Sequence, residues 1–106
     1  MARPRSAKWT LGTPEHNKYL REHHRRRRAA ALELLGGCCA RCGFTDSRAL
    51  QIDHVHNDGY ADRKRWSAGT AHLRIVASIL AGTDTGRYQV LCANCNWIKK
   101  AERYIP

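Results

Sequence analysis

The chain reads CARC from Cys39 to Cys42 and CANC from Cys92 to Cys95. In a Cys-x-x-Cys pair the spacing lets one tight turn point two thiolates at a single ion, and two pairs complete a tetrahedral shell of four sulfurs. All four positions of such a shell are filled, so no place is left for a reacting water. The pattern predicts a structural zinc ion joining segments far apart in the sequence. In a chain of 106 residues, much of its binding energy would be folding energy.

The fifth cysteine, Cys38, leaves an ambiguity in this assignment. Cys38 could take the place of Cys39, but the Cys-x-x-Cys spacing and the glycine that follows favour Cys39 and Cys42 as ligands. Cys38 is then a small buried side chain or a spare thiol. Two unrelated thiol pairs, or a redox motif, are the alternatives to a metal site.

The compartment also bears on how the cysteines are interpreted. Residues 1–11 carry charge but no apolar run of the kind found in signal peptides. No stretch approaches the roughly 18 apolar residues of a membrane span. We therefore expect an intracellular, cytoplasmic protein with no membrane partner, in which thiols stay reduced and metal binding is favoured over disulfides.

The charge of the chain is strongly unbalanced. Lysine and arginine number 19 against 9 aspartates and glutamates, which gives a formal net charge of +10. Such an excess indicates a polyanionic partner, and DNA is the leading candidate because no lipidation signal is present. The alternative is that the charge serves solubility alone.

A single domain is expected over residues 14–106, after a flexible basic N-terminus at 1–13. The predicted fold class is small α+β, with a helical insertion between two strands. The expected order is a basic helix at 14–37, the first Cys-x-x-Cys and a strand at 38–59, an insertion at 60–87, and a second strand, the second Cys-x-x-Cys and a final helix at 88–106.

Local signals refine these boundaries. Thr13 followed by Pro14 is typical of a helix start, and two glycines at 36–37 would end that helix. Residues 49–52 suit a short strand that ends at Asp53. The insertion is predicted to open as a basic loop at 60–69 and to continue as a helix at 70–81, where apolar residues recur at helical spacing. A second strand is expected at 88–91 and a helix at 93–105.

Three polar residues form a candidate catalytic group. Asp53 ends the first strand, His54 follows it directly, and Asn96 follows the second Cys-x-x-Cys, in the first turn of the final helix. The zinc ion would hold this helix start close to the strand. A carboxylate and an amide oxygen suit magnesium or manganese, and an imidazole can act as a base near neutral pH. The alternative for Asp53 and His54 is a strand-end turn with no chemistry.

Taken together, these motifs resemble a known family. The run LCANCN at 91–96, preceded upstream by Asp53-His54-x-His56 and by the first Cys-x-x-Cys, resembles the HNH endonucleases, also called ββα-metal or His-Me fingers. The closest resemblance is to the phage recombination endonuclease VII branch. The matching motifs cover roughly residues 38–59 and 88–103.

The resemblance implies a metal-dependent endonuclease that hydrolyses DNA phosphodiester bonds, on a zinc-stapled ββα-metal finger. Asp53 and Asn96 would be divalent metal ligands, His54 the general base, and His56 a contact to the scissile phosphate or a support for the site. The four paired cysteines would bind structural zinc. A phage or mobile-element origin, with the protein inside a bacterial or phage-infected cell, is likewise implied by resemblance only. Two departures matter: the insertion after Gly59 is long, and many HNH enzymes carry histidine where this chain has Asn96.

Cationic residues predict how DNA would be held. The run Arg25, Arg26, Arg27 and Arg28 is interpreted as a phosphate-contacting face, or simply a solvated one, and Arg63, Lys64 and Arg65 form a second cluster. On the final helix, helical spacing groups Asn96, Lys99, Lys100 and Arg103 on a DNA-facing side, and Trp97, Ile98, Ala101 and Ile105 on an inward side. Trp66 either stacks on a base or fills the core, with the core favoured. The histidines without a partner pattern are assigned no role: His16, His23, His24 and His72.

Two other classes of function remain open at this point. A non-catalytic zinc module that binds nucleic acid, or a protein-interaction module, would have the same cysteines and charge. Neither has any need for Asp53, His54 and Asn96 together. Since one active centre cuts one strand, cleavage of both strands would indicate a homodimer.

Overall fold

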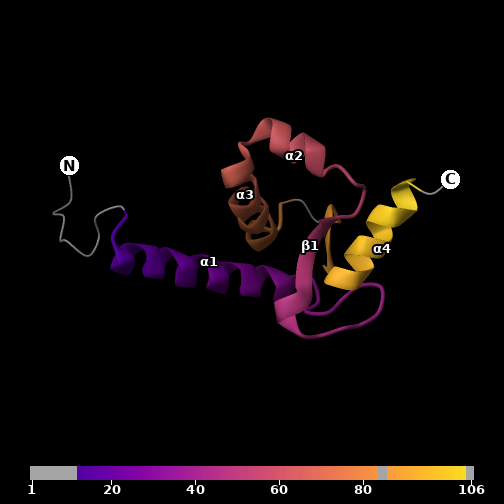
Figure 1. Ribbon diagram of the computed structural model, residues 1–106, viewed down its shortest axis with the longest axis horizontal. Coiled ribbons are helices and arrows are strands. Elements are labelled where there is room, and N and C mark those ends of the chain that lie inside the picture. The colour runs from indigo at the N-terminus through magenta and orange to yellow at the C-terminus, as the bar shows by residue number, and fades with distance from the viewer. Residues whose placement is uncertain (1–11, 84–85, 105–106) are drawn as a thin grey trace.

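The first helix forms a basic arm. The computed structural model describes residues 12–83 and 86–104, and α1 runs over Pro14–Leu34. As predicted, Thr13 caps it: the Thr13 hydroxyl accepts a hydrogen bond from the His16 backbone at 3.2 Å, and Pro14 opens the helix. The buried residues of α1 are Ala31 and Leu32, near its end, and Figure 1 shows the N-terminal part of the helix extending away from the other elements. The predicted flexible segment 1–13 lies largely outside the described residues.

Two antiparallel strands form the sheet. β1 is Leu50–His54, preceded by the short 3-10 turn η2 at Ser47–Ala49, and β2 is Tyr88–Cys92. The register pairs Leu50 with Cys92 and His54 with Tyr88. Both predicted strands are therefore confirmed, with β1 continuing one residue past Asp53.

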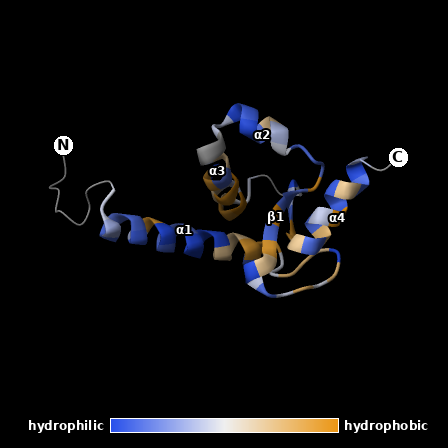
Figure 2. Ribbon diagram, viewed as in Figure 1, coloured by the Kyte–Doolittle hydropathy of each residue, from blue (hydrophilic) through white to orange (hydrophobic). Residues whose placement is uncertain are grey.

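Helices pack on both faces of this sheet. The apolar helix α3, Ala68–Ala81, lies against α1, and its buried residues Ile75, Val76 and Ile79 form one cluster with Tyr88. On the other side, α4, Ala93–Tyr104, follows β2 directly (Figure 1). Figure 2 shows α3 as strongly hydrophobic and α1 as mainly hydrophilic. The described part of the chain is thus a small α+β fold with a helical insertion, as predicted.

The expected loop at 60–69 was wrong. Residues Gly59–Arg65 form the helix α2, which follows the turn where Asn57 has a φ of 58°. An acidic residue in its first turn and three cations in its last turn suit the helix dipole. Asp62 anchors α2 from within, because its buried carboxylate bonds to side chains of both strands and of residue 87. The polar composition of this stretch indicated a loop, and nothing in the sequence indicated the tertiary contact made by Asp62.

The predicted faces of α4 were also wrong. Trp97 and Ile98 are exposed and Ala101 is on the surface, whereas Cys95 and Lys99 are buried. The helix is rotated because the thiol of Cys95 joins the other cysteines and the ammonium of Lys99 reaches the partly buried carboxylate of Asp53. Two polar anchors one turn apart therefore outweigh the apolar stripe. Ile105, which was also expected to face inward, lies outside the described residues.

Among the described residues, no helix combines the length and the apolar character needed to cross a membrane.

Trp66 packs against the hydrophobic cluster around α3, so it fills the core, as favoured from the sequence.

Replacement of Leu91 by alanine is expected to destabilise the fold strongly. Leu91 is fully buried in the cluster that includes the paired cysteines, so the substitution leaves a cavity and should lower the free energy of unfolding by about 2–5 kcal/mol. Urea denaturation followed by circular dichroism, with metal present, measures it. Leu34→Ala is the matched control: Leu34 is exposed, and its loss should cost less than about 0.5 kcal/mol. Equal effects of the two substitutions would contradict this core.

Candidate functional site

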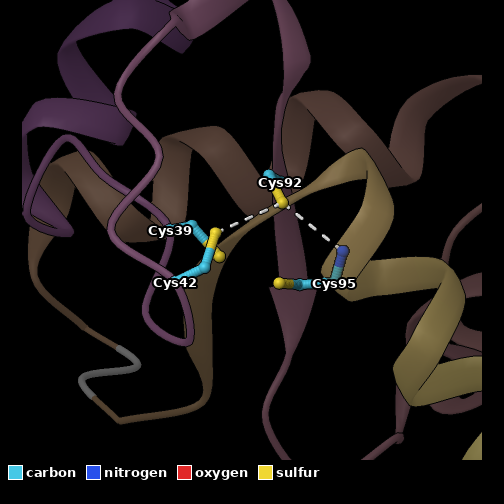
Figure 3. A group of neighbouring side chains, drawn as sticks. All are labelled: Cys39, Cys42, Cys92 and Cys95. Atoms are coloured by element: carbon cyan, nitrogen blue, oxygen red, sulfur yellow. Dashed lines mark hydrogen bonds between the residues drawn. The ribbon is translucent and has the colours of Figure 1, made fainter.

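Four cysteines from distant parts of the chain form one cluster. The sulfurs of Cys39, Cys42, Cys92 and Cys95 all lie within 4.8 Å of one another, and Figure 3 shows the side chains converging. A tetrahedral ion with metal–sulfur bonds of about 2.3 Å requires sulfurs about 3.8 Å apart. The Cys42 and Cys92 sulfurs are separated by 3.7 Å. The arrangement can hold a structural metal ion, and Cys38 is not part of it, as favoured from the sequence.

The thiols of this cluster differ widely in acidity. Burial alone would raise the pKa of the Cys39 thiol, but hydrogen bonds from the backbone of Cys92, Cys42 and Arg41 lower it to about 6. The contact with the Cys92 sulfur, together with burial, raises the pKa of Cys95 to about 12. Protons shared among closely packed sulfurs must leave when a cation binds, so metal affinity should increase with pH.

Backbone hydrogen bonds tie the first cysteine turn to the sheet. The turn closes through a bond from Gly43 to the carbonyl of Cys39 at 2.9 Å, and Ala40 donates to the carbonyl of Val90 at 2.8 Å. Gly43 has a φ of +79°, which glycine adopts without strain. Since Cys92 ends β2 and Cys95 lies in the first turn of α4, the cluster joins the turn, the strand and the helix.

A polar hollow of 240 Å³ lies where β1 ends, lined also by residues of α2 and α4. Asp53, His54 and Asn96 all line it, so the three residues of the candidate catalytic group meet in one place. Three cations share its lining: Arg63, Lys100 and Arg103. His56 is exposed and does not line the hollow.

His54 has an acidic partner that was missed from the sequence. Its Nε2 lies 2.6 Å from Oδ2 of Asp62, a residue of α2 that is only 2 % exposed. The rings of His54 and Tyr88 also pack in a T-shaped arrangement, with ring centroids 5.1 Å apart. The available signal was an acidic residue within a stretch of cations, but nothing in the sequence placed α2 beside the strand.

Asp62 remains ionised well into acid. Burial opposes the charged form, but hydrogen bonds from His54 and Arg87 outweigh it and hold the pKa of Asp62 below its ordinary value of 3.8. Because the folded-state pKa is lowered, the carboxylate stabilises the fold above that ordinary value. This contribution is lost as the pH falls through the lower, folded-state pKa. The ionised Asp62 carboxylate is an acceptor only, so the Nε2 atom of His54 carries the hydrogen between them. In the neutral form of the ring, Nδ1 is then the nitrogen with a free lone pair.

Asp53 has a buried cationic partner that was also missed. The Lys99 ammonium lies 2.5 Å from Oδ2 of Asp53 and 2.6 Å from the carbonyl of His54. Gln89, opposite Asp53 in the sheet register, donates to the same carboxylate oxygen at 2.9 Å. The interpretation of Lys99 as an exposed DNA contact was therefore wrong: its side chain is buried, and its charge is paired within the protein with Asp53.

The remaining predicted DNA-contacting residues differ in their solvent exposure and in whether they bond within the protein. Arg25 and Arg26 are exposed on α1, whereas Arg28 donates to the carbonyl of Leu50 at 2.6 Å and is held against β1. Arg27 is partly buried. Of the cluster on α2, the members Arg63, Lys64 and Arg65 are all exposed.

Comparisons of this chain with protein-family models, curated proteins and solved structures found no match.

Removal of one cluster sulfur is expected to abolish tight metal binding. Purified wild-type protein should contain about one zinc ion per chain. Cys92→Ser should lose the ion and unfold, because the fold depends on the linkage. Mass spectrometry under native conditions and circular dichroism measure both. Cys38→Ser, next to the cluster but outside it, should keep the ion and the fold. A folded, metal-free Cys92→Ser protein would contradict the role of the cluster.

Proposed function

We propose that the chain is an HNH-type endonuclease that uses a divalent metal to hydrolyse phosphodiester bonds of DNA. The observation that carries the proposal is one hollow lined by Asp53, His54 and Asn96 together with three cations. A carboxylate, an imidazole and an amide are the groups that metal-assisted hydrolysis requires. The cations would bind the phosphates on either side of the scissile bond, which agrees with a net charge of +10.

His54 is the general base in this proposal. Its Nε2 atom is held by the Asp62 carboxylate, so its Nδ1 atom is available to take a proton from the attacking water. The geometry at Gly59 supports this assignment. A Cβ atom built there would lie 3.2 Å from Nδ1 of His54, so the absence of a side chain keeps that nitrogen uncrowded. Asp62 is a positioning residue that fixes the ring and favours the protonated form after the transfer.

The residues of the hollow fit a hard cation such as magnesium or manganese. Oδ2 of Asp53 accepts from Lys99 and Gln89, while Oδ1 has no hydrogen-bond partner among the described residues. Asn96 donates its amide nitrogen to Gln51 at 2.5 Å, which leaves its amide oxygen as a ligand. Both are oxygen donors, the kind that these ions prefer. A bound ion would stabilise charge on the phosphate as it develops.

The finer architecture belongs to the same proposal. The unit β1–β2–α4 is proposed as a ββα-metal finger, with α2 and α3 inserted between its strands. Zinc is proposed for the four-cysteine cluster, because four closely grouped cysteine sulfurs suit it better than they suit ions that prefer oxygen ligands. His56 is exposed at the edge of this unit, where it remains a predicted phosphate contact.

One observation favours a second function, a non-catalytic zinc module that binds nucleic acid. Asp53 is already neutralised by Lys99, so its carboxylate has a partner without any divalent ion. A binding module would keep the basic surface and the cysteine cluster. Such a module would bind DNA but would not cut it, whichever divalent ion is added.

Substitution of His54 is the direct test of catalysis. Supercoiled plasmid is incubated with magnesium or manganese, and the rate of nicking is measured. His54→Ala should lower the rate by about 10²–10⁴-fold, the usual contribution of a general base, while metal content and circular dichroism stay unchanged. His72→Ala, a histidine on α3 outside the hollow, is the matched control and should cut as the wild type does. Equal cutting by His54→Ala, or no cutting by the wild type, would overturn the proposal.

Substitution of Asp62 tests whether it orients the base. Asp62→Asn replaces an acceptor by an amide that can donate to Nε2 and place the hydrogen on Nδ1, so nicking should slow by about 10²-fold or more. Nitrogen-15 NMR of the His54 ring should show an unprotonated Nδ1 in the wild type and a changed tautomer in the variant. Asp58→Asn is the control, since Asp58 bonds to Arg87 but not to His54. A slowed enzyme with an unchanged tautomer would leave Asp62 with a structural role alone.

A further inference from the structure

We propose that Trp97, with Lys100 beside it, forms a stacking subsite for unpaired bases of single-stranded DNA, next to the candidate active site. The inference rests on the proposed function for the identity of the polymer. It goes further by naming the substrate class: a strand whose bases are not paired where it crosses the site.

Trp97 is displayed on the surface of α4. The inward positions of that helix are held by Cys95 and Lys99, so the residue midway between them points away from the core and is 70 % exposed. A ring of this size would stabilise the fold considerably if it were buried. A single exposed apolar residue is common on protein surfaces and is no site in itself. The groups around Trp97 distinguish it from such a residue.

The ring lines a second hollow, of 140 Å³, that adjoins the candidate active site. Gln51 and Ala93 contribute to this hollow together with Asn96, Trp97 and Lys100. Asn96 and Lys100 line the active-site hollow as well. A nucleotide lying against Trp97 would therefore be a close neighbour of a phosphate held at His54 and Asn96.

Cations and aromatic rings together line these two hollows. The Lys100 ammonium lies 5.3 Å from the centre of the Trp97 ring, and Arg63 and Arg103 line the active-site hollow. From α2, Tyr60 adds a second aromatic residue to that lining, and it is 68 % exposed. Cations that follow a phosphate backbone, interleaved with rings that take bases, are the features of surfaces that bind single strands.

Stacking on an exposed ring selects unpaired DNA. In a duplex each base is stacked between its neighbours, and its faces are not available to a side chain. In an unpaired strand the faces of the bases can be exposed with little loss of stacking and pairing energy. Each base that stacks on an aromatic residue contributes to affinity, whichever of the four bases it is. The duplex would meet only the cations of this surface.

The test compares binding of single-stranded and duplex DNA. The full-length His54→Ala protein, which cannot cut in the proposed mechanism, is titrated into a labelled single strand of about 15 nucleotides and into a hairpin duplex of the same sequence. Fluorescence anisotropy gives the dissociation constants. Adding Trp97→Ala should weaken single-strand binding by about 5- to 100-fold and duplex binding less than about twofold. Trp97→Phe should retain most of the single-strand affinity, because it keeps an aromatic face.

Tyr104→Ala is the matched control. Tyr104 is an exposed aromatic residue of the same helix that lines neither hollow, and its loss should change single-strand affinity less than about twofold. Circular dichroism and metal content verify that each variant is folded. Three results would overturn the subsite: unchanged single-strand binding in Trp97→Ala, an equal loss for single strand and duplex, or no single-strand binding by the parent protein.

The two proposals fail separately. Binding is measured without cleavage, so a selective loss in Trp97→Ala supports the subsite even if the wild type nicks no plasmid, in which case only the nuclease proposal fails. Conversely, an active nuclease whose Trp97→Ala variant binds and cuts single strands as well as the wild type removes the subsite and leaves the nuclease.

Discussion

Four sulfurs that converge on one point determine how the elements around them are arranged. The cysteine cluster connects the turn at 39–42, the end of β2 and the first turn of α4, three segments that the apolar core alone would hold weakly in so small a chain. A cation bound there contributes its free energy of binding to folding. It also fixes the direction in which α4 leaves the sheet, and that direction determines what reaches the end of β1.

The rotation of α4 about its axis follows from the position of Cys95 in the cysteine cluster, and it determines which side chains of the helix face the sheet, the hollow or the solvent. With Cys95 held in the cluster, Lys99 falls one turn later on the same face and meets Asp53. Asn96 and Lys100, each one position further on, reach the rim of the polar hollow, and Trp97 turns outward. The orientation of the candidate base, His54, is fixed independently by Asp62 of α2, whose carboxylate bonds to the imidazole.

Much of the fold and part of the candidate site could be predicted from the sequence. The spacing of the cysteines identified the cluster. The period of the apolar residues, the helix-capping residues and the glycines at helix ends and turns located α1, α3, α4 and both strands. These signals could be used because they are local in the sequence. The residues Asp62 and Lys99 were missed because their roles depend on tertiary contacts that no local pattern records. The same reason explains the wrong face assigned to α4. Hydrophobic period predicts an inward apolar stripe, whereas the contacts of the Cys95 thiol with the other cysteines and of the Lys99 ammonium with Asp53 decided the rotation of the helix.

X-ray absorption at the zinc edge of the purified protein reports the atoms that surround the ion. A structural site formed by the four cysteines predicts one zinc ion with four sulfur neighbours at about 2.3 Å and no nitrogen or oxygen in the shell. A shell that contains nitrogen or oxygen, or a fully folded protein that holds no zinc, would contradict it.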